Sequence, residues 1–181
     1  MKTIKLFFVL GFLCVGNLAH AGFAEKFLQT VKDGDLENVR SYISSGGNVN
    51  VRGKYNDTPL LWASYEGHYS IVKILIKARA EINAEDKYGL TPLLVSSSGG
   101  HYNIVKALIE AGADINATEE YGITALMFAS HKGYYNIAEM LIKAGAEVNL
   151  KNKVGGTALG LALQAGHTKI IKLLRKTGAH E

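Results

Sequence analysis

The chain has 181 residues, about the length of a single domain. It contains 20 lysine and arginine residues against 16 aspartate and glutamate residues, so its formal net charge at pH 7 is +4. This near balance argues against a nucleic-acid-binding protein, which would carry a basic stripe on one face.

The first 21 residues have the three parts of a secretory signal peptide. Residues 1–5 are short and basic, residues 6–15 are almost wholly apolar, and Ala19-His20-Ala21 has the small residues of a cleavage site. The apolar run is shorter than the about 20 residues that span a bilayer, which favours a cleaved signal over a membrane anchor. We therefore predict cleavage after Ala21 and a mature chain of residues 22–181.

Cleavage would also change the composition of the chain. The only cysteine, Cys14, lies in the signal, so the mature chain would have neither a disulfide nor a thiol nucleophile. Lys2 and Lys5 lie there too, which lowers the net charge to +2. No amphipathic membrane helix and no Ser/Pro/Gly-rich linker follows, so we expect one continuous domain that does not insert into a membrane after cleavage.

The mature chain repeats itself with a period of 33 residues. One period shared by three independent positions indicates one supersecondary unit stacked on copies of itself. Such a stack offers a long repetitive surface that suits contact with another macromolecule, rather than one deep pocket. The repeated positions are Thr58, Thr91, Thr124 and Thr157; Gly67, Gly100, Gly133 and Gly166; and Asn50, Asn83, Asn116 and Asn149.

Residues 86–118 show how one unit is built. Thr91 is a good N-cap for a first helix, and Pro92 suits the first helical position because its missing N–H would be unpaired there anyway. Gly100 ends this helix, and apolar residues spaced along 104–109 predict one face of a second helix. Gly112 stops the second helix, and an extended loop with a turn follows.

This pattern resembles the ankyrin repeat. Thr-Pro-Leu, then Gly-His, then Ile-Val-x-x-Leu-Ile, then Gly-Ala-Asp-x-Asn recur in phase over nearly the whole mature chain. The resemblance implies an all-α solenoid of five stacked helix-turn-helix units with projecting β-turn or hairpin loops. It also implies a protein-binding role, without naming the partner. We place the units at residues 22–52, 53–85, 86–118, 119–151 and 152–181.

The two ends and two positions depart from the family pattern. Residues 23–52 are expected to form a solvated first unit with a degraded first helix, and the basic residues of helix 169–176 are expected to form a C-terminal cap. Arg79 replaces the glycine that ends the second helix elsewhere, which predicts a left-handed backbone at a cost of about 1 kcal/mol. The usual histidine after Thr-Pro-Leu is replaced by apolar residues or glycine, which predicts apolar packing there: Leu61, Leu94, Met127 and Gly160.

Resemblance to ankyrin arrays implies that a partner contacts the turn tips and the exposed side of the first helices. Tyrosines recur at the tips, where they could form a contact column or could instead pack the turn beside a glycine. Leu90 and Ile123 are expected to add exposed apolar area. The candidate contact residues are Lys54, Tyr55, Lys87, Tyr88, Leu90, Glu120, Tyr121 and Ile123 at the tips, and Tyr65, Glu66, His131 and Lys132 on the helices.

The remaining polar repeats have structural interpretations. His68, His101 and His167 lie in different units, too far apart for the about 2 Å bonds of one zinc ion, so we expect them to satisfy the inter-helix turns. The asparagines are expected to bond within loops, and the lysines of the second helices to face water. No nucleophile-elbow, phosphate-binding or metalloprotease motif is present, so we predict no enzyme, cofactor or metal.

These observations predict a monomeric protein-binding module exported to the periplasm, since the signal resembles a bacterial one. Its role would be that of a scaffold, a regulator or an immunity-type binder of a partner protein. A secreted effector that binds host proteins and a purely structural component of the envelope are the alternatives. Nucleic acid is not expected as a partner in that compartment.

Overall fold

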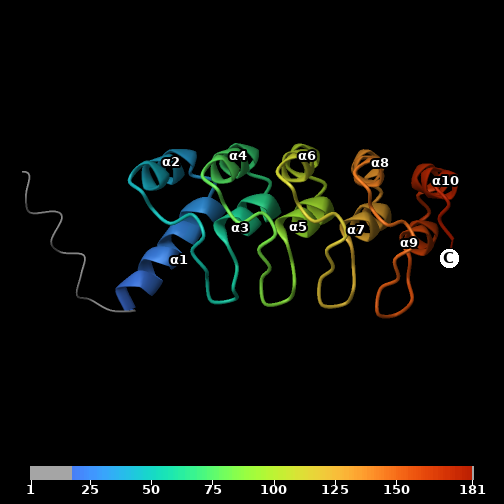
Figure 1. Ribbon diagram of the computed structural model, residues 1–181, viewed down its shortest axis with the longest axis horizontal. Coiled ribbons are helices and arrows are strands. Elements are labelled where there is room, and N and C mark those ends of the chain that lie inside the picture. Colours follow the sequence, from blue (N-terminus) through green and yellow to red (C-terminus); the bar gives the residue numbers. More distant parts are fainter. Residues whose placement is uncertain (1–17, 181) are drawn as a thin grey trace, which may run out of the picture.

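The computed structural model describes residues 18–180, with side chains from residue 22 onward. Figure 1 shows these residues as two parallel rows of helices with a row of loops along one side. The predicted signal segment lies outside the described residues up to residue 17, and so does Cys14. Residues 18–21 open the first helix.

Ten helices account for nearly all regular structure within residues 18–180, which confirms the predicted all-α solenoid. β pairing in these residues is limited to one isolated bridge between Thr118 and Thr124. Successive helices in each row pack against one another, and each first helix packs against the second helix that follows it. The first helices are α1 (Leu18–Lys32), α3 (Pro59–Tyr65), α5 (Pro92–Gly99), α7 (Ala125–Lys132) and α9 (Ala158–Ala165); the second helices are α2 (Leu36–Ser44), α4 (Tyr69–Lys77), α6 (Tyr102–Glu110), α8 (Tyr135–Lys143) and α10 (Thr168–Lys176).

Local hydrogen bonds start and stop the first helices as the sequence predicts. The Thr91 hydroxyl accepts the backbone N–H of Leu94 at 3.3 Å, and the other three repeated threonines cap their helices in the same way. Gly100 follows α5 with φ +76°, a conformation that costs glycine nothing. Local bonds therefore set the starts of α3, α5, α7 and α9.

The repeated histidines bond between units. His101 Nε2 lies 3.1 Å from the carbonyl oxygen of Tyr65, one unit earlier, and His68 and His167 make the same bond to Lys32 and His131. The His101 ring fills the space where a Cβ on Gly67 would stand. The expected structural role is confirmed, with the acceptor in the preceding unit rather than in the local turn.

The repeated asparagines also connect neighbouring units. The side chain of Asn83 accepts the N–H of Asp114 at 2.9 Å and donates to the carbonyl of Gly112 at 3.3 Å. Asn50, Asn116 and Asn149 make the equivalent pairs of bonds one unit along. The expected loop hydrogen bonding is confirmed, and it also holds the ends of the second helices in register.

The core runs the length of the stack between the two rows of helices. Leu75, Leu108, Leu141 and Leu174 occupy one position of successive second helices, and all four are fully buried. Leu94 and Met127 are buried at the position where the family usually has histidine, so the predicted apolar packing is confirmed there.

The first unit differs from its prediction. Its first helix is not degraded: α1 has 15 residues, whereas α3 has 7. Phe27, Leu28 and Val31 are buried at helical spacing, and the Phe27 ring stacks on Tyr42 with 3.8 Å between centroids. The prediction underestimated this helix because this unit lacks the Thr-Pro-Leu start, although its apolar spacing is clear.

Candidate partner-binding surface

A carboxylate or amide inside each loop builds the tips of the third to fifth units. Asp86 Oδ1 accepts the backbone N–H groups of Tyr88 at 2.8 Å and Leu90 at 2.9 Å. Gly89 completes the turn with φ +77°. Glu119 and Asn152 accept two N–H groups in the same way in the following loops. Each tip is therefore a rigid turn.

Backbone bonds join each tip to the next. Lys87 donates its N–H to the carbonyl of Tyr55 at 2.8 Å, and Glu120 donates to the carbonyl of Tyr88 at the same distance. Lys153 donates to Tyr121 at 2.9 Å, which continues the series. The row of loops in Figure 1 is thus one connected edge rather than a set of independent loops.

The tip tyrosines stand exposed on this edge. Tyr55 is 46%, Tyr88 48% and Tyr121 65% accessible to solvent. Lys87 Nζ lies between two of them, 3.9 Å from the ring centroid of Tyr55 and 4.6 Å from that of Tyr88. A hydrogen bond with the Tyr88 side chain raises the pKa of Lys87 above its ordinary value. The side chains of Tyr55, Tyr88, Tyr121, Lys54, Lys87 and Glu120 are named here the tip surface.

Leu90 and Ile123 correct one prediction. Both were expected to be exposed at the tips, but both are partly buried and pack against the hydrophobic core. Their backbone N–H groups bond to Asp86 and Glu119, which turns the side chains inward. They support the tips from below and add little apolar area to the surface.

The tip of the second unit, residues 53–85, is built from different residues. Gly53 stands where the third unit has Asp86, and the carboxylate comes instead from Asp57, which accepts the N–H of Tyr55 at 3.0 Å. That carboxylate occupies the space of a side chain at residue 53, 2.6 Å from an ideal Cβ. Asn56 takes the left-handed position with φ +62°, where the later units have glycine.

Asp57 also ties this tip to the first-helix row. Its second carboxylate oxygen accepts the indole N–H of Trp62 in α3. The Trp62 ring meets Tyr65 edge to face at 5.8 Å, and Lys32 lies 3.8 Å from its centroid. A continuous path therefore runs from the tip to Tyr65. Trp62 was not among the contact residues predicted from the sequence, although it is the single tryptophan of the chain and stands in register with Val95 and Phe128.

The predicted contact residues on the first helices lie at the C-terminal ends of α3 and α7. Tyr65, Glu66, His131 and Lys132 are all exposed. The carbonyls of Tyr65 and His131 accept bonds from histidines of the following units, so the backbone beneath these side chains is fixed. Between the two pairs, α5 ends in serine and glycine residues, whose side chains are smaller than the exposed side chains at the ends of α3 and α7.

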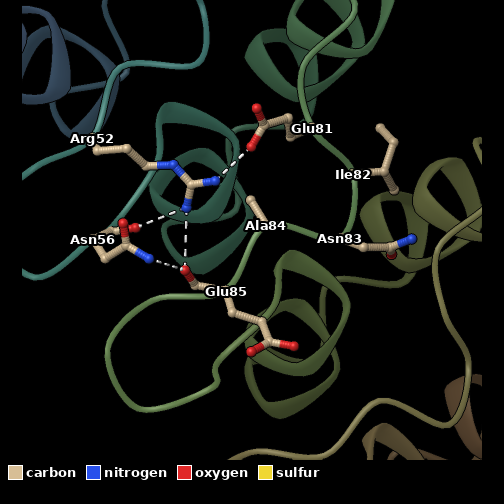
Figure 2. A pocket seen from close by; sticks show the side chains of 7 residues that line it. All are labelled: Arg52, Asn56, Glu81, Ile82, Asn83, Ala84 and Glu85. Atoms are coloured by element: carbon tan, nitrogen blue, oxygen red, sulfur yellow. Dashed lines mark hydrogen bonds and ion pairs between the residues drawn. The ribbon is translucent and has the colours of Figure 1, made fainter.

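Internal hydrogen bonds and an ion pair line a groove beside the tips of the second and third units. Figure 2 shows the guanidinium of Arg52 donating to the carbonyls of Asn56 and Glu85, both at 3.2 Å, and pairing with the carboxylate of Glu81. Asn56 donates to the same Glu85 carbonyl at 2.8 Å. These polar groups satisfy one another, and their bonds join two neighbouring loops.

Among the residues whose placement is described, no group of three or more histidine, cysteine, aspartate or glutamate side chains is positioned to hold a metal ion. No helix in that same part of the chain combines the length and apolar character needed to cross a bilayer. What the surface does present is a rigid edge of half-exposed tyrosines with charged neighbours, the composition typical of protein-binding sites.

The fold and this edge define the class of protein: a helical repeat solenoid that binds other proteins. A family model described as ankyrin repeats (3 copies) matches residues 27–119, about half of the chain, and one described as ankyrin repeats (many copies) matches residues 98–142. The chain belongs to the ankyrin repeat family. Because these matches end at residue 142, the assignment of residues 152–181 as a fifth unit stays a prediction, although α9 and α10 pack onto the stack as earlier pairs do.

One relative contains a similar repeat within a much longer protein. An ankyrin repeat-containing protein of Saccharomyces cerevisiae is 41% identical to this chain over 51 residues. That stretch is 28% of this chain and only 10% of the yeast protein. The likeness therefore concerns the repeat itself.

Proposed function

We propose that this chain is a non-catalytic binding module whose tip surface, together with the ends of α3 and α7, contacts a partner protein. The observation that carries this proposal is the row of half-exposed tyrosines on tips that are locked to one another by backbone bonds. Tyrosine gives large contact area at low entropic cost, and a rigid edge loses little freedom on binding.

An enzymatic role has less support. Glu66, His131 and Lys132 are titratable and exposed, but Glu66 follows α3 whereas His131 and Lys132 end α7, and no pair of them is hydrogen-bonded among the described residues. A catalytic base needs an orienting partner and a nucleophile or substrate within hydrogen-bond reach. The chemistry of this surface suits recognition better than turnover.

The proposal includes export to the periplasm, where the protein would act as a scaffold, a regulator or an immunity-type binder. The basic segment, the apolar run and Ala19-His20-Ala21 support it. Intact-mass measurement of the exported protein should show an N-terminus at Gly22. A soluble cytoplasmic protein that keeps Met1 would contradict the compartment.

The interface is tested at its centre. A standard protein interface covers about 800 Å² on each partner, within reach of three neighbouring units, so Tyr88 should lie near its middle. With a partner isolated from envelope extract, Tyr88→Ala should weaken binding by about 2 kcal/mol. Lys106→Ala, on α6 in the row of second helices, should have little effect. Equal losses from both variants, or a loss from Lys106→Ala alone, would mean that the interface lies on the second helices.

The same extract separates the alternatives. One stoichiometric partner protein would favour the binding module. Sedimentation with cell-wall material and no discrete partner would favour a purely structural role. Recovery of the processed protein from the culture medium, with binding to host proteins, would favour a secreted effector.

A further inference from the structure

The tips of the third to fifth units use their backbone N–H groups internally. Of the five N–H groups of residues 86–90, Asp86 accepts three, and the carbonyls of Tyr55 and Leu90 accept one each. Residues 119–123 and 152–156 repeat this pattern. A strand that adds to an exposed edge pairs with free backbone N–H groups, so these tips do not suit an added strand of a partner.

The surface between neighbouring tips does not suit a helix either. Leu90 and Ile123, the apolar residues nearest the tips, pack against the core. An amphipathic helix needs an apolar groove that takes its apolar face. The hollow between the tips of the third and fourth units is instead lined mainly by polar side chains and glycines: Lys87, Tyr88, Gly89, Thr118, Glu119, Glu120, Gly122 and Lys153.

The tip surface does present one exposed aromatic ring in each of three successive units, from Tyr55, Tyr88 and Tyr121. The first helices of these units pack directly on one another, which spaces the units by about 8–10 Å. Lys87 Nζ lies 3.9 Å from the Tyr55 centroid and 4.6 Å from the Tyr88 centroid, so these two rings are no farther apart than that spacing. One turn of a polyproline II helix takes three residues and rises about 9 Å, so successive turns would meet successive tyrosines.

The hydrogen-bonding groups of the tip surface are mostly donors. Tyr55, Tyr88 and Tyr121 have exposed hydroxyl groups, and Lys54 and Lys87 have exposed ammonium groups. A proline-rich segment offers the opposite, because its carbonyls are free to accept while its prolines have no N–H to donate. Neither lysine takes part in the ion pairs found among the described residues, so both are available to a carboxylate of the partner.

We propose that the tip surface binds a proline-rich segment of the partner in the polyproline II conformation, with a carboxylate beside Lys54 or Lys87. This inference rests on the proposed function, because it assigns a ligand to the same surface. One proline in three lies on a tyrosine ring, and the carbonyls between them accept from the tyrosine hydroxyls and the lysines. Both the segment and the locked tips are rigid before they meet, so binding loses little conformational freedom.

Three synthetic peptides test this proposal on the exported chain. The first has nine prolines, which make three turns, with one glutamate at each end. The second has lysines in place of the glutamates, and the third keeps the glutamates around alternating glycine and serine. The first peptide should bind and shift the ring NMR signals of Tyr55, Tyr88 and Tyr121. The flexible peptide should bind about tenfold more weakly because it must be ordered, and the lysine peptide about threefold more weakly because of its charge.

The chain offers a matched pair of tyrosines for the mutational test. Tyr88 is 48% exposed at its tip, and Tyr102 is 44% exposed on α6 in the same unit. Tyr88→Ala should weaken binding of the first peptide about tenfold, whereas Tyr102→Ala should leave it unchanged. Tyr88→Phe keeps the ring and should stay within about threefold of the unchanged protein. Far-UV circular dichroism and the urea midpoint show whether each variant is folded, and Tyr121→Ala replaces Tyr88→Ala if that variant is not.

The charge of the tips has its own matched pair. Lys87 and Lys106 are both exposed lysines of the third unit. Lys87→Gln should weaken binding of the first peptide about threefold and leave the flexible peptide weaker still, and Lys106→Gln should change neither. An equal loss from Lys106→Gln would mean that the peptide responds to overall charge and would contradict a carboxylate site at Lys87.

Three further results would overturn the proposal: no binding of the first peptide at millimolar concentration, equal binding of the flexible peptide, and an equal loss from Tyr102→Ala. The proposed function fails by a different result. A partner from envelope extract that binds Tyr88→Ala as well as the unchanged protein would contradict the tip interface itself. A partner that loses affinity with Tyr88→Ala, but that the first peptide does not displace, would keep the interface and exclude the proline-rich ligand.

Discussion

The second and third units, residues 53–85 and 86–118, build the same tip from different residues. In the third unit, Asp86 fills the inside of the loop and Gly89 takes the left-handed position. The second unit has no side chain at the first of these positions and no glycine at the second. The tip requires one acceptor inside the loop and one left-handed residue, and more than one position can supply them.

In the second unit, the carboxylate inside the loop also bonds to a residue of the first helix. Asp57 is 5% exposed and serves both the N–H of Tyr55 and the indole of Trp62. Asp86 is less buried and bonds only to backbone N–H groups of its own loop among the described residues. The second unit therefore couples its tip to α3, whereas the third keeps the two apart.

The largest expected effect comes from breaking the Asp57 bonds that join the tip to α3. Asp57→Ala should lower the free energy of unfolding by about 3 kcal/mol, because a partly buried indole N–H and a backbone N–H lose their acceptor. Asp86→Ala should cost about 1 kcal/mol, since the freed N–H groups can reach water. Urea denaturation of both variants measures the difference. Equal losses would mean that the Trp62 bond contributes nothing.

A smaller effect tests whether the two constructions are interchangeable. Gly53→Asp should destabilise the protein by about 2 kcal/mol, because the new side chain meets the Asp57 carboxylate in a space that holds one carboxylate. In an Asp57→Leu background, which has the leucine of the third unit, the same substitution should raise stability instead. A double-mutant cycle from urea midpoints gives the coupling. Independent, additive effects would show that the two side chains do not share the space.

The smallest effect concerns the ends of the second helices. Arg79 is left-handed with φ +63°, where Gly112 has φ +88° in the third unit, so the predicted conformation is confirmed. Arg79→Gly should stabilise the protein by about 0.5 kcal/mol, and at most about 1, because relief of strain exceeds the entropy that glycine adds to the unfolded chain. Gly112→Arg is the reverse control and should destabilise. A lower urea midpoint for Arg79→Gly would reveal a compensating contact of the arginine.

Much of the fold could be predicted from the sequence because its signals are local. The threonine caps bond three residues along the chain, and the glycines that follow the first helices act through their own backbone. The exposure of Tyr55, Tyr88 and Tyr121 could also be anticipated from their place in the turn. The length of α1 was not anticipated, because its start lacks the repeated cap.

The sequence by itself determined the repeat, the starts of the threonine-capped helices and the positions of the tips, since each depends on residues close in the chain. Only the tertiary structure decided which side chains meet across units. It pairs His101 with Tyr65, turns Leu90 inward and sets Lys87 between two tyrosines. These contacts join residues about one unit apart or turn a side chain toward the core, so they follow from how the units pack and not from the 33-residue pattern.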